Sequence, residues 1–138
     1  MPDAVSYLTK NEIMSRAFIL LRPPFLTESE GIHRCERSID FAFSTGVECC
    51  TVIPVRPGNG AMDLLMERGD FTSPDIHSLE RVLEYGIGLN AGRVFADVWD
   101  LSLFSGCNKC IDQRTNRLIA MNLSQTIISQ IKCACDSL

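Results

Sequence analysis

Apolar residues are arranged along the first half of the chain as two continuous runs with a periodic segment between them. Residues 16–21 and 47–55 are nearly unbroken apolar runs, which is typical of strands covered on both faces in a parallel sheet. From Ile32 to Phe43, apolar residues recur at spacings of three and four, which predicts a helix with one buried face. The sequence over 27–30 matches a capping box, and Gly46 supplies a stop. We therefore expect a right-handed parallel βαβ unit.

Turn residues and further periodic segments follow. Residues 61–68 show a short helical pattern that ends at Gly69. Ser73 and Pro74 predict the cap and first turn of another helix, whose apolar stripe runs from Ile76 to Ile87. These segments continue the alternation of strands and helices.

Residues 93–99 alternate as a third strand, in which Asp97 faces either a polar barrel mouth or solvent. We expect Trp99 to be a core anchor, because a lone tryptophan more often packs in a core than stacks on a ligand. Asp100 is expected to cap a helical turn over 101–104. The elements together predict an α/β protein.

A strand-to-helix corner spans residues 51–62. Loops that follow the carboxyl ends of parallel strands are where ligands bind, because backbone N–H groups and a helix N-terminus meet there. Arg56 and Asn59 are therefore candidate ligand-binding residues. Alternatively, the loop only turns the chain, with Gly58 and Gly60 supplying the required dihedrals and Arg56 in solvent.

Composition narrows the class of protein. The 138 residues are 46% apolar and 22% charged, as in one ordinary soluble domain. The net charge of −4 argues against broad electrostatic binding of nucleic acid, although it permits a local basic groove. The longest apolar run, 17–21, is too short to span a bilayer, and the N-terminal segment lacks the features of a signal peptide. We expect a cytoplasmic protein with no membrane partner.

Three of the seven cysteines, which are Cys35 on the buried face of the first predicted helix and the adjacent Cys49 and Cys50, carry little functional signal, as do both histidines. Cys49 and Cys50 are adjacent in a predicted strand and point to opposite faces, so they are expected to be small buried packing residues. His33 and His77 lie on polar helix faces without a partner at metal-ligand spacing, so we expect surface roles.

The remaining cysteines form two close pairs near the end of the chain. A C-x2-C turn and a C-x-C turn together can complete a tetrahedral S₄ site, which suits zinc and also suits an iron–sulfur cluster. Apolar residues from Leu118 to Ile131 predict a helix that returns the second pair to the first. The alternative is that these residues are free thiols. The candidate ligands are Cys107, Cys110, Cys133 and Cys135.

Two segments of the chain resemble a known enzyme family. Residues 22–30 and 53–60 resemble the last two strand–loop units of the radical SAM barrel, in the branch of elongator catalytic subunits and methylthiotransferases. The corner 58–62, the segment 95–100 and the cysteine-rich tail resemble uncharacterised relatives of an archaeosine-synthase radical SAM subunit. The resemblance covers residues 15–135.

The resemblance implies an iron–sulfur oxidoreductase whose late strands line a pocket for S-adenosylmethionine. It implies radical modification of a substrate, with RNA as one candidate. The positions that match the pocket are Leu21, Arg22, Pro23, Pro24, Pro54, Val55 and Arg56.

The chain departs from this family in one essential feature. Radical SAM enzymes hold a [4Fe–4S] cluster on a C-x3-C-x2-C triplet after the first strand, and no such triplet is present. We therefore expect residues 1–104 to be the C-terminal part of a β/α barrel, inactive alone, and residues 105–138 to be a metal-binding tail with four cysteine ligands. A half barrel leaves an open sheet edge and an apolar interior, so the expected partner is a second copy or a missing N-terminal half. The alternative is a non-catalytic, zinc-stabilised interaction module.

Overall fold

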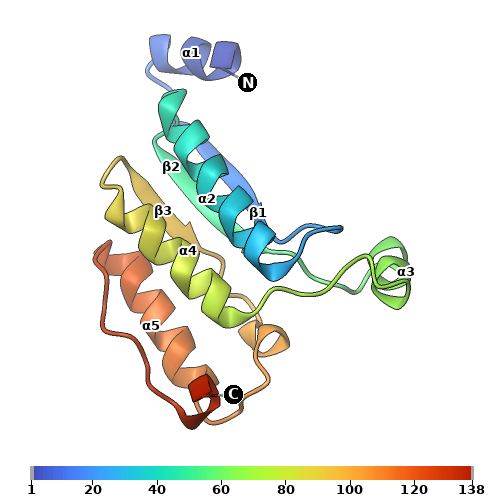
Figure 1. Cartoon of the computed structure of the whole chain (residues 1–138). Helices are drawn as coiled ribbons and strands as arrows, with labels where there is room; N and C mark the ends of the chain where they lie inside the picture. The colour runs from blue at the N-terminus through green and yellow to red at the C-terminus, as the bar shows by residue number, and fades with distance from the viewer. Residues whose placement is uncertain (1, 138) are drawn as a thin grey trace.

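Residues 2–137, which the computed structural model describes, form an α/β fold (Figure 1). The elements in chain order are α1 (Pro2–Lys10), β1 (Arg16–Leu21), α2 (Glu28–Ser44), β2 (Cys49–Pro54), α3 (Gly60–Glu67), α4 (Ile76–Gly88), β3 (Arg93–Ala96), the 3-10 helix η1 (Leu101–Phe104), α5 (Ile111–Ser124) and the 3-10 helix η2 (Ala134–Ser137).

The three strands form one parallel sheet in the order β1-β2-β3, which confirms the predicted parallel crossover. Arg16 pairs with Cys49 at one end of the β1–β2 ladder and Leu21 pairs with Pro54 at the other. The predicted capping box begins α2, where Thr27 accepts from the Glu30 amide and Glu30 accepts from the Thr27 amide. The three described strands do not close into a barrel.

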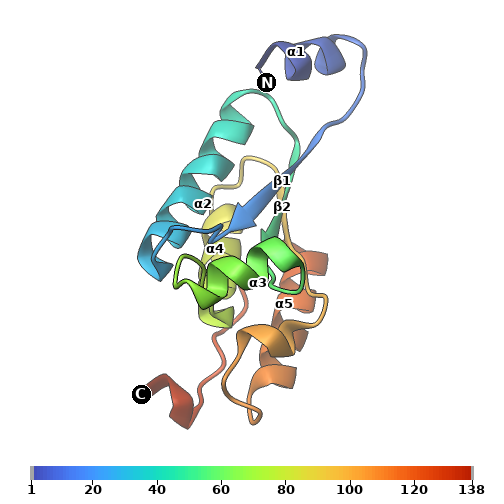
Figure 2. The ribbon, with the colours of Figure 1, turned by 90° about the vertical axis from the view of Figure 1, so that its right-hand side faces the viewer.

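The helices cover only one face of the sheet, and this corrects the expectation of strands covered on both faces. Figures 1 and 2 show α2 and α4 packed side by side over the strands. Ile19 and Leu21 of β1 point into this layer and are buried, whereas Phe18 and Leu20 point away and are 65% and 53% exposed. The apolar run therefore predicts the strand but not its covering, because side chains on both faces are apolar.

The two edges of the sheet differ. At β3, the side-chain amide of Gln125 both donates to and accepts from the backbone of Val94, and Asn122 does the same at Ala96, with distances of 2.9–3.0 Å. These two amides occupy the edge as a neighbouring strand would. At the other edge, β1 pairs only with β2 among the described residues.

The end of the third strand differs from the prediction. β3 stops at Ala96 rather than Trp99, although the Asp97 amide still donates to Val52 at 2.8 Å. Trp99 is 68% exposed, so the expectation of a core anchor is wrong. Asp100 has a φ of 46° and its side chain accepts from the hydroxyl of Ser102 instead of capping the backbone of η1. Trp99 instead lies beside Arg56, whose guanidinium is 5.1 Å from the centre of its ring.

Two helix boundaries also differ from the prediction. Asp75, not Ser73, caps α4 by accepting from the amide of His77. The predicted helix over 118–131 ends at Ser124, because Gln125 takes a left-handed conformation as its side chain bonds the backbone of Val94. Residues 126–133 then return as an irregular segment beside α5 (Figure 1).

The C-terminal segment shares the hydrophobic core of the strands. Leu118 and Met121 of α5 are fully buried in the same cluster as Val52 and Val94. No helix among the described residues is long and apolar enough to cross a bilayer.

Gly86 provides a test of the packing between α4 and β3. A Cβ at this position would lie 2.7 Å from Val94 Cγ1. Alanine is favoured over glycine by about 1 kcal/mol in an open helix, but overpacking costs about 1–3 kcal/mol. We expect Gly86→Ala to lower the free energy of unfolding by up to about 2 kcal/mol, as measured by urea denaturation.

The same substitution in a Val94→Ala background should be neutral or stabilising, since the opposing methyl groups are then absent. Stabilisation by Gly86→Ala in the otherwise unchanged chain would contradict the close packing.

Candidate metal centre

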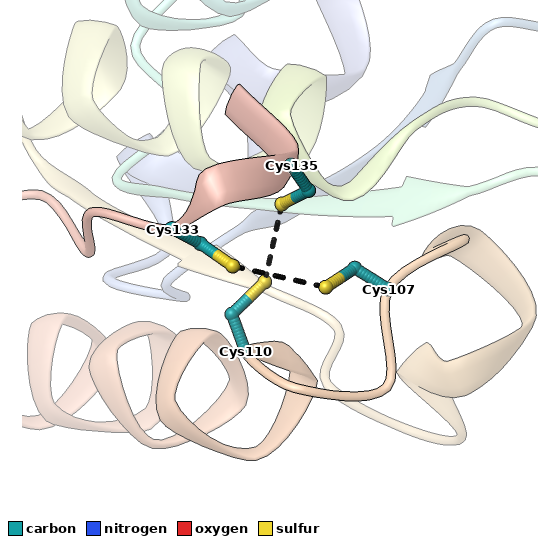
Figure 3. A group of neighbouring side chains, drawn as sticks. All are labelled: Cys107, Cys110, Cys133 and Cys135. Atoms are coloured by element: carbon teal, nitrogen blue, oxygen red, sulfur yellow. Dashed lines mark hydrogen bonds between the residues drawn. The ribbon is translucent and has the colours of Figure 1, made fainter. Parts of the chain in front are cut away.

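Two separate turns bring four thiols together (Figure 3). The C-x2-C pair lies in the turn before α5, where Cys110 is the residue preceding the helix and is 2% exposed. The C-x-C pair lies at the start of η2, and the two pairs approach from opposite sides. We call this group the cysteine cluster; its members are Cys107, Cys110, Cys133 and Cys135.

The sulfur atoms are close enough to share one ion. The Sγ atoms of Cys107 and Cys133 are 3.8 Å apart, and those of Cys110 and Cys135 are 3.6 Å apart. All four Sγ atoms lie within 4.8 Å of one another. The structure thus brings together every cysteine that the spacing of the sequence singles out.

The C-x2-C turn favours a thiolate. The backbone N–H groups of Lys109 and Cys110 point toward the sulfur of Cys107 and lower its pKa to about 6. Hydrogen bonding to Cys133, together with burial and the neighbouring thiols, raises the pKa of Cys135 to about 12. One negative charge is therefore easily formed in the cluster, and the proximity of the thiols opposes the next.

The cysteines outside the cluster have a different environment. Cys35, Cys49 and Cys50 are buried, as expected for packing residues. Burial raises the pKa of Cys35 to about 12 and that of Cys50 to about 11. Those two thiols remain protonated at neutral pH, whereas Cys107 in the cluster has thiolate character.

Arg114 joins the cysteine cluster to the rest of the protein. Its Nε donates to Cys110 Sγ at 3.2 Å, and its Nη1 donates to Glu80 at 2.8 Å. Its Nη2 donates to Asp136 at 2.6 Å. Although burial opposes the charged form, these partners raise the pKa of Arg114, so the guanidinium stays charged beside the sulfur.

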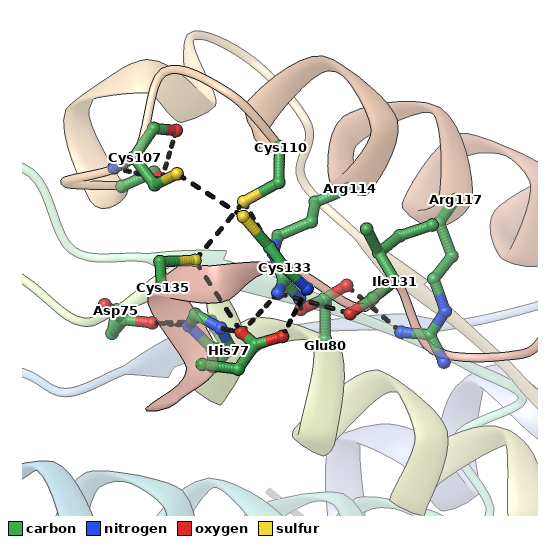
Figure 4. A network of polar contacts seen from close by, with 12 residues as sticks. Asp75, His77, Glu80, Cys107, Cys110, Arg114, Arg117, Ile131, Cys133 and Cys135 are labelled. Carbon is green, nitrogen blue, oxygen red and sulfur yellow. Dashed lines mark hydrogen bonds and ion pairs between the residues drawn. The ribbon is translucent and has the colours of Figure 1, made fainter. Parts of the chain in front are cut away.

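Arg117, one turn later on α5, holds the irregular segment over residues 126–133, which we call the return segment. Its Nε donates to the carbonyls of Ile128 and Ser129 at 3.0 and 3.1 Å, and its Nη2 donates to Ile128 at 2.6 Å. The same side chain pairs with Glu80 at 3.1 Å and with Glu84. Because Glu80 is only 5% exposed and pairs with both arginines, it joins α4 to α5 at one buried point (Figure 4).

Asp136 organises the C-x-C turn and was missed from the sequence. Its carboxylate accepts from the amide of Cys133 at 2.9 Å and contacts the ring of His77 at 2.9 Å. His77 also contacts Asp75. The prediction that no carboxylate lies at metal-ligand spacing from His77 is therefore wrong, although its side chain is exposed, as expected. Burial alone would lower the pKa of His77, but the hydrogen bonds to Asp136 and Asp75 raise it, while that of Asp136 is lowered. Only its position directly after C-x-C could have indicated Asp136.

The corner residues make internal contacts. Arg56 pairs with Asp97 at 3.0 Å, and its guanidinium lies 5.1 Å from the ring centres of both Trp99 and Phe104. Asn59 caps α3 by accepting from the Met62 amide at 2.9 Å. The Arg56 side chain thus ties the carboxyl end of β2 to the segment after β3.

The other predicted pocket positions lie at the carboxyl ends of β1 and β2. Leu21 and Pro54 are buried opposite each other in the ladder, Pro23, Pro24 and Val55 are partly exposed, and Arg22 is in the left-handed region with a φ of 55°. Arg22 pairs with Glu28 and donates to the carbonyl of Ser73 at 3.2 Å. The structure brings Leu21 and Pro54 together, while Asn59 caps a separate helix beyond them.

Comparison of the chain with protein-family models, with curated proteins and with solved structures finds no match.

Replacing Arg117 by lysine tests the buried network. Lysine keeps the positive charge but cannot bond two carboxylates and two carbonyls at once. We expect Arg117→Lys to lower the free energy of unfolding by about 2–3 kcal/mol, because Glu80 and the carbonyl of Ile128 lose partners.

Arg37→Lys is the matched control. Arg37 is exposed on α2 and forms no ion pair among the described residues, so its replacement should change stability by less than about 0.5 kcal/mol. Equal effects of the two substitutions in chemical denaturation would contradict a structural role for the network.

Proposed function

We propose that the chain is a non-catalytic interaction module whose C-terminal segment is fixed by one zinc ion bound to the cysteine cluster. The observation that supports this proposal is the spacing of the sulfurs. Zn–S bonds of about 2.3 Å place tetrahedral sulfurs about 3.8 Å apart. The Sγ separations of 3.6 and 3.8 Å in the two closest pairs fit this value with little movement.

A single ion fits the cluster better than an iron–sulfur cluster does. In an iron–sulfur cluster the four cysteines are divided over two or four iron atoms, so the sulfurs on different irons stand farther apart than sulfurs around one ion. All four Sγ atoms here lie within 4.8 Å of one another. This spacing supports one mononuclear site over the auxiliary cluster.

Four thiolates would give the ion a structural role. A tetrahedral site filled by protein ligands has no position for water or substrate. Arg114, which donates to Cys110 Sγ, offsets part of the negative charge of four thiolates. The ion would hold η2 against the start of α5, and its binding energy would add to that of folding the return segment.

A second candidate is the C-terminal half of a radical SAM barrel, which would contribute part of an S-adenosylmethionine pocket when a separate chain supplies the cluster motif. The sequential parallel order of the strands and the helices on one face support it, because a β/α barrel has this arrangement. The exposed side of the sheet, with Phe18 and Leu20, would then face the barrel interior.

The zinc site makes a direct prediction. Protein purified without chelator should contain one zinc per chain by elemental analysis, and Cys133→Ser should lower the affinity for zinc at least about tenfold. The melting temperature of Cys133→Ser should also fall, since zinc binding is coupled to the folding of the return segment.

Cys49→Ala is the control, since Cys49 lies in β2 outside the cluster, and its zinc content should be unchanged. Iron with acid-labile sulfide in the purified protein would show an iron–sulfur cluster in place of zinc. Absence of any metal, together with an unchanged melting temperature in Cys133→Ser, would refute the metal site.

The two candidates differ in their chemistry. The isolated chain, reconstituted anaerobically with iron and sulfide and then given a reductant and S-adenosylmethionine, should produce no 5′-deoxyadenosine. No C-x3-C-x2-C triplet is present to hold the cluster that supplies the electron. Turnover by this chain alone would contradict the non-catalytic assignment, whereas turnover only with a partner that carries the triplet would favour the half barrel.

A further inference from the structure

The open edge of β1 presents unpaired backbone groups. The carbonyls of Ser15 and Leu21 accept from the amides of Glu48 and Val55, which flank β2, so the odd-numbered residues of this strand face β2. Peptide groups alternate in direction along a strand, and the N–H and C=O groups of Phe18 and Leu20 therefore face outward. They are the groups with which an added strand would pair.

This edge forms one wall of a groove, and α2 forms the other. The groove has a volume of about 930 Å³ and is lined by residues 17–20 of β1. Its apolar surface includes Phe18, Leu20 and Phe41, each more than half exposed. A strand edge beside a helix is the geometry that binds extended peptides by strand addition.

The α2 wall carries positive charge. Arg34 and Arg37 line the groove, and neither forms an ion pair among the described residues. The carboxylate of Glu30 also lines it and accepts from the amide of Thr27 at 2.8 Å, so the wall carries two guanidinium groups against one carboxylate. The groove is thus locally cationic on a chain with a net charge of −4.

The same charge argues against a second copy of the chain as occupant. A two-fold contact places the same patch of both molecules together, so it would bring Arg34 and Arg37 against their own counterparts. Carboxylates on a partner strand would instead pair with these guanidinium groups. The other edge of the sheet is closed by Asn122 and Gln125, which leaves β1 as the accessible edge.

We propose that the groove between β1 and α2 binds an extended acidic peptide segment of another protein by strand addition. The segment pairs with the backbone of Phe18 and Leu20, and its carboxylates face Arg34 and Arg37. This inference rests on the proposed function in assigning a docking role, but the groove and the cysteine cluster lie on different elements.

The test uses the purified metal-bound chain and two labelled peptides six residues long, the length of β1. One alternates valine and glutamate, and the other alternates valine and lysine. Fluorescence anisotropy should show binding of the acidic peptide only. Arg34→Glu with Arg37→Glu should weaken it at least about tenfold, because two attractive contacts become repulsive.

A control for total charge is Lys10→Glu with Arg68→Glu, which makes the same change at exposed sites on α1 and at the end of α3 and should leave binding within about twofold. Leu20→Pro removes an outward N–H but no bond to β2, so it should weaken binding about tenfold while Leu20→Val does not. Circular dichroism checks that each variant is folded.

Equal binding of both peptides, or no effect of either the arginine or the proline substitution, would overturn the proposal. A dimer in sedimentation that Leu20→Pro dissociates would also overturn it, by assigning the edge to a second copy. Zinc is measured on the same samples. If the protein contains zinc but does not bind the acidic peptide, the proposed groove is contradicted and the metal site is not. If it binds the acidic peptide but contains no zinc, the metal site is contradicted and the groove is not.

Discussion

The buried carboxylate of Glu80 is the point on which the C-terminal half of the structure depends. It lies on α4 and pairs with Arg114 and Arg117 of α5, at 2.8 and 3.1 Å. Burying three charges costs free energy that must be offset by good geometry and further hydrogen bonds. The two arginines provide these bonds, because their remaining N–H groups reach the return segment and Asp136. The ionic network thereby decides where the second cysteine pair lies.

Different interactions hold the sheet and the segment that follows α5. Hydrophobic burial under α2 and α4 holds the sheet, whereas charge and sulfur hold the segment after α5. If the cysteine cluster binds zinc as proposed, loss of the ion would affect η2 before the strands. The groove proposed for docking is lined by β1 and α2, whereas the cysteine cluster lies before α5 and at η2, so the groove does not depend on the ion.

Local patterns in the sequence predict much of this fold. The capping box at Thr27 and the cysteine spacing are short-range signals, and both correspond to observed features. The contact between His77 and Asp136 spans 59 positions, and no local pattern records it. The burial of Trp99 and the length of α5 were also wrongly predicted, because Trp99 lies against Arg56 and α5 ends where Gln125 bonds the backbone of Val94, and both contacts join distant parts of the sequence. The open face of the sheet could not be predicted, since apolar runs do not reveal which face is covered.

X-ray absorption at the zinc edge of the purified protein tests the central claim most directly. The account predicts a single shell of four sulfur atoms at about 2.3 Å and no nearby second metal. A shell that mixes sulfur with nitrogen or oxygen would contradict the assignment of all four ligands to Cys107, Cys110, Cys133 and Cys135. An iron absorption edge with an iron–iron distance, in place of zinc, would contradict the mononuclear site itself.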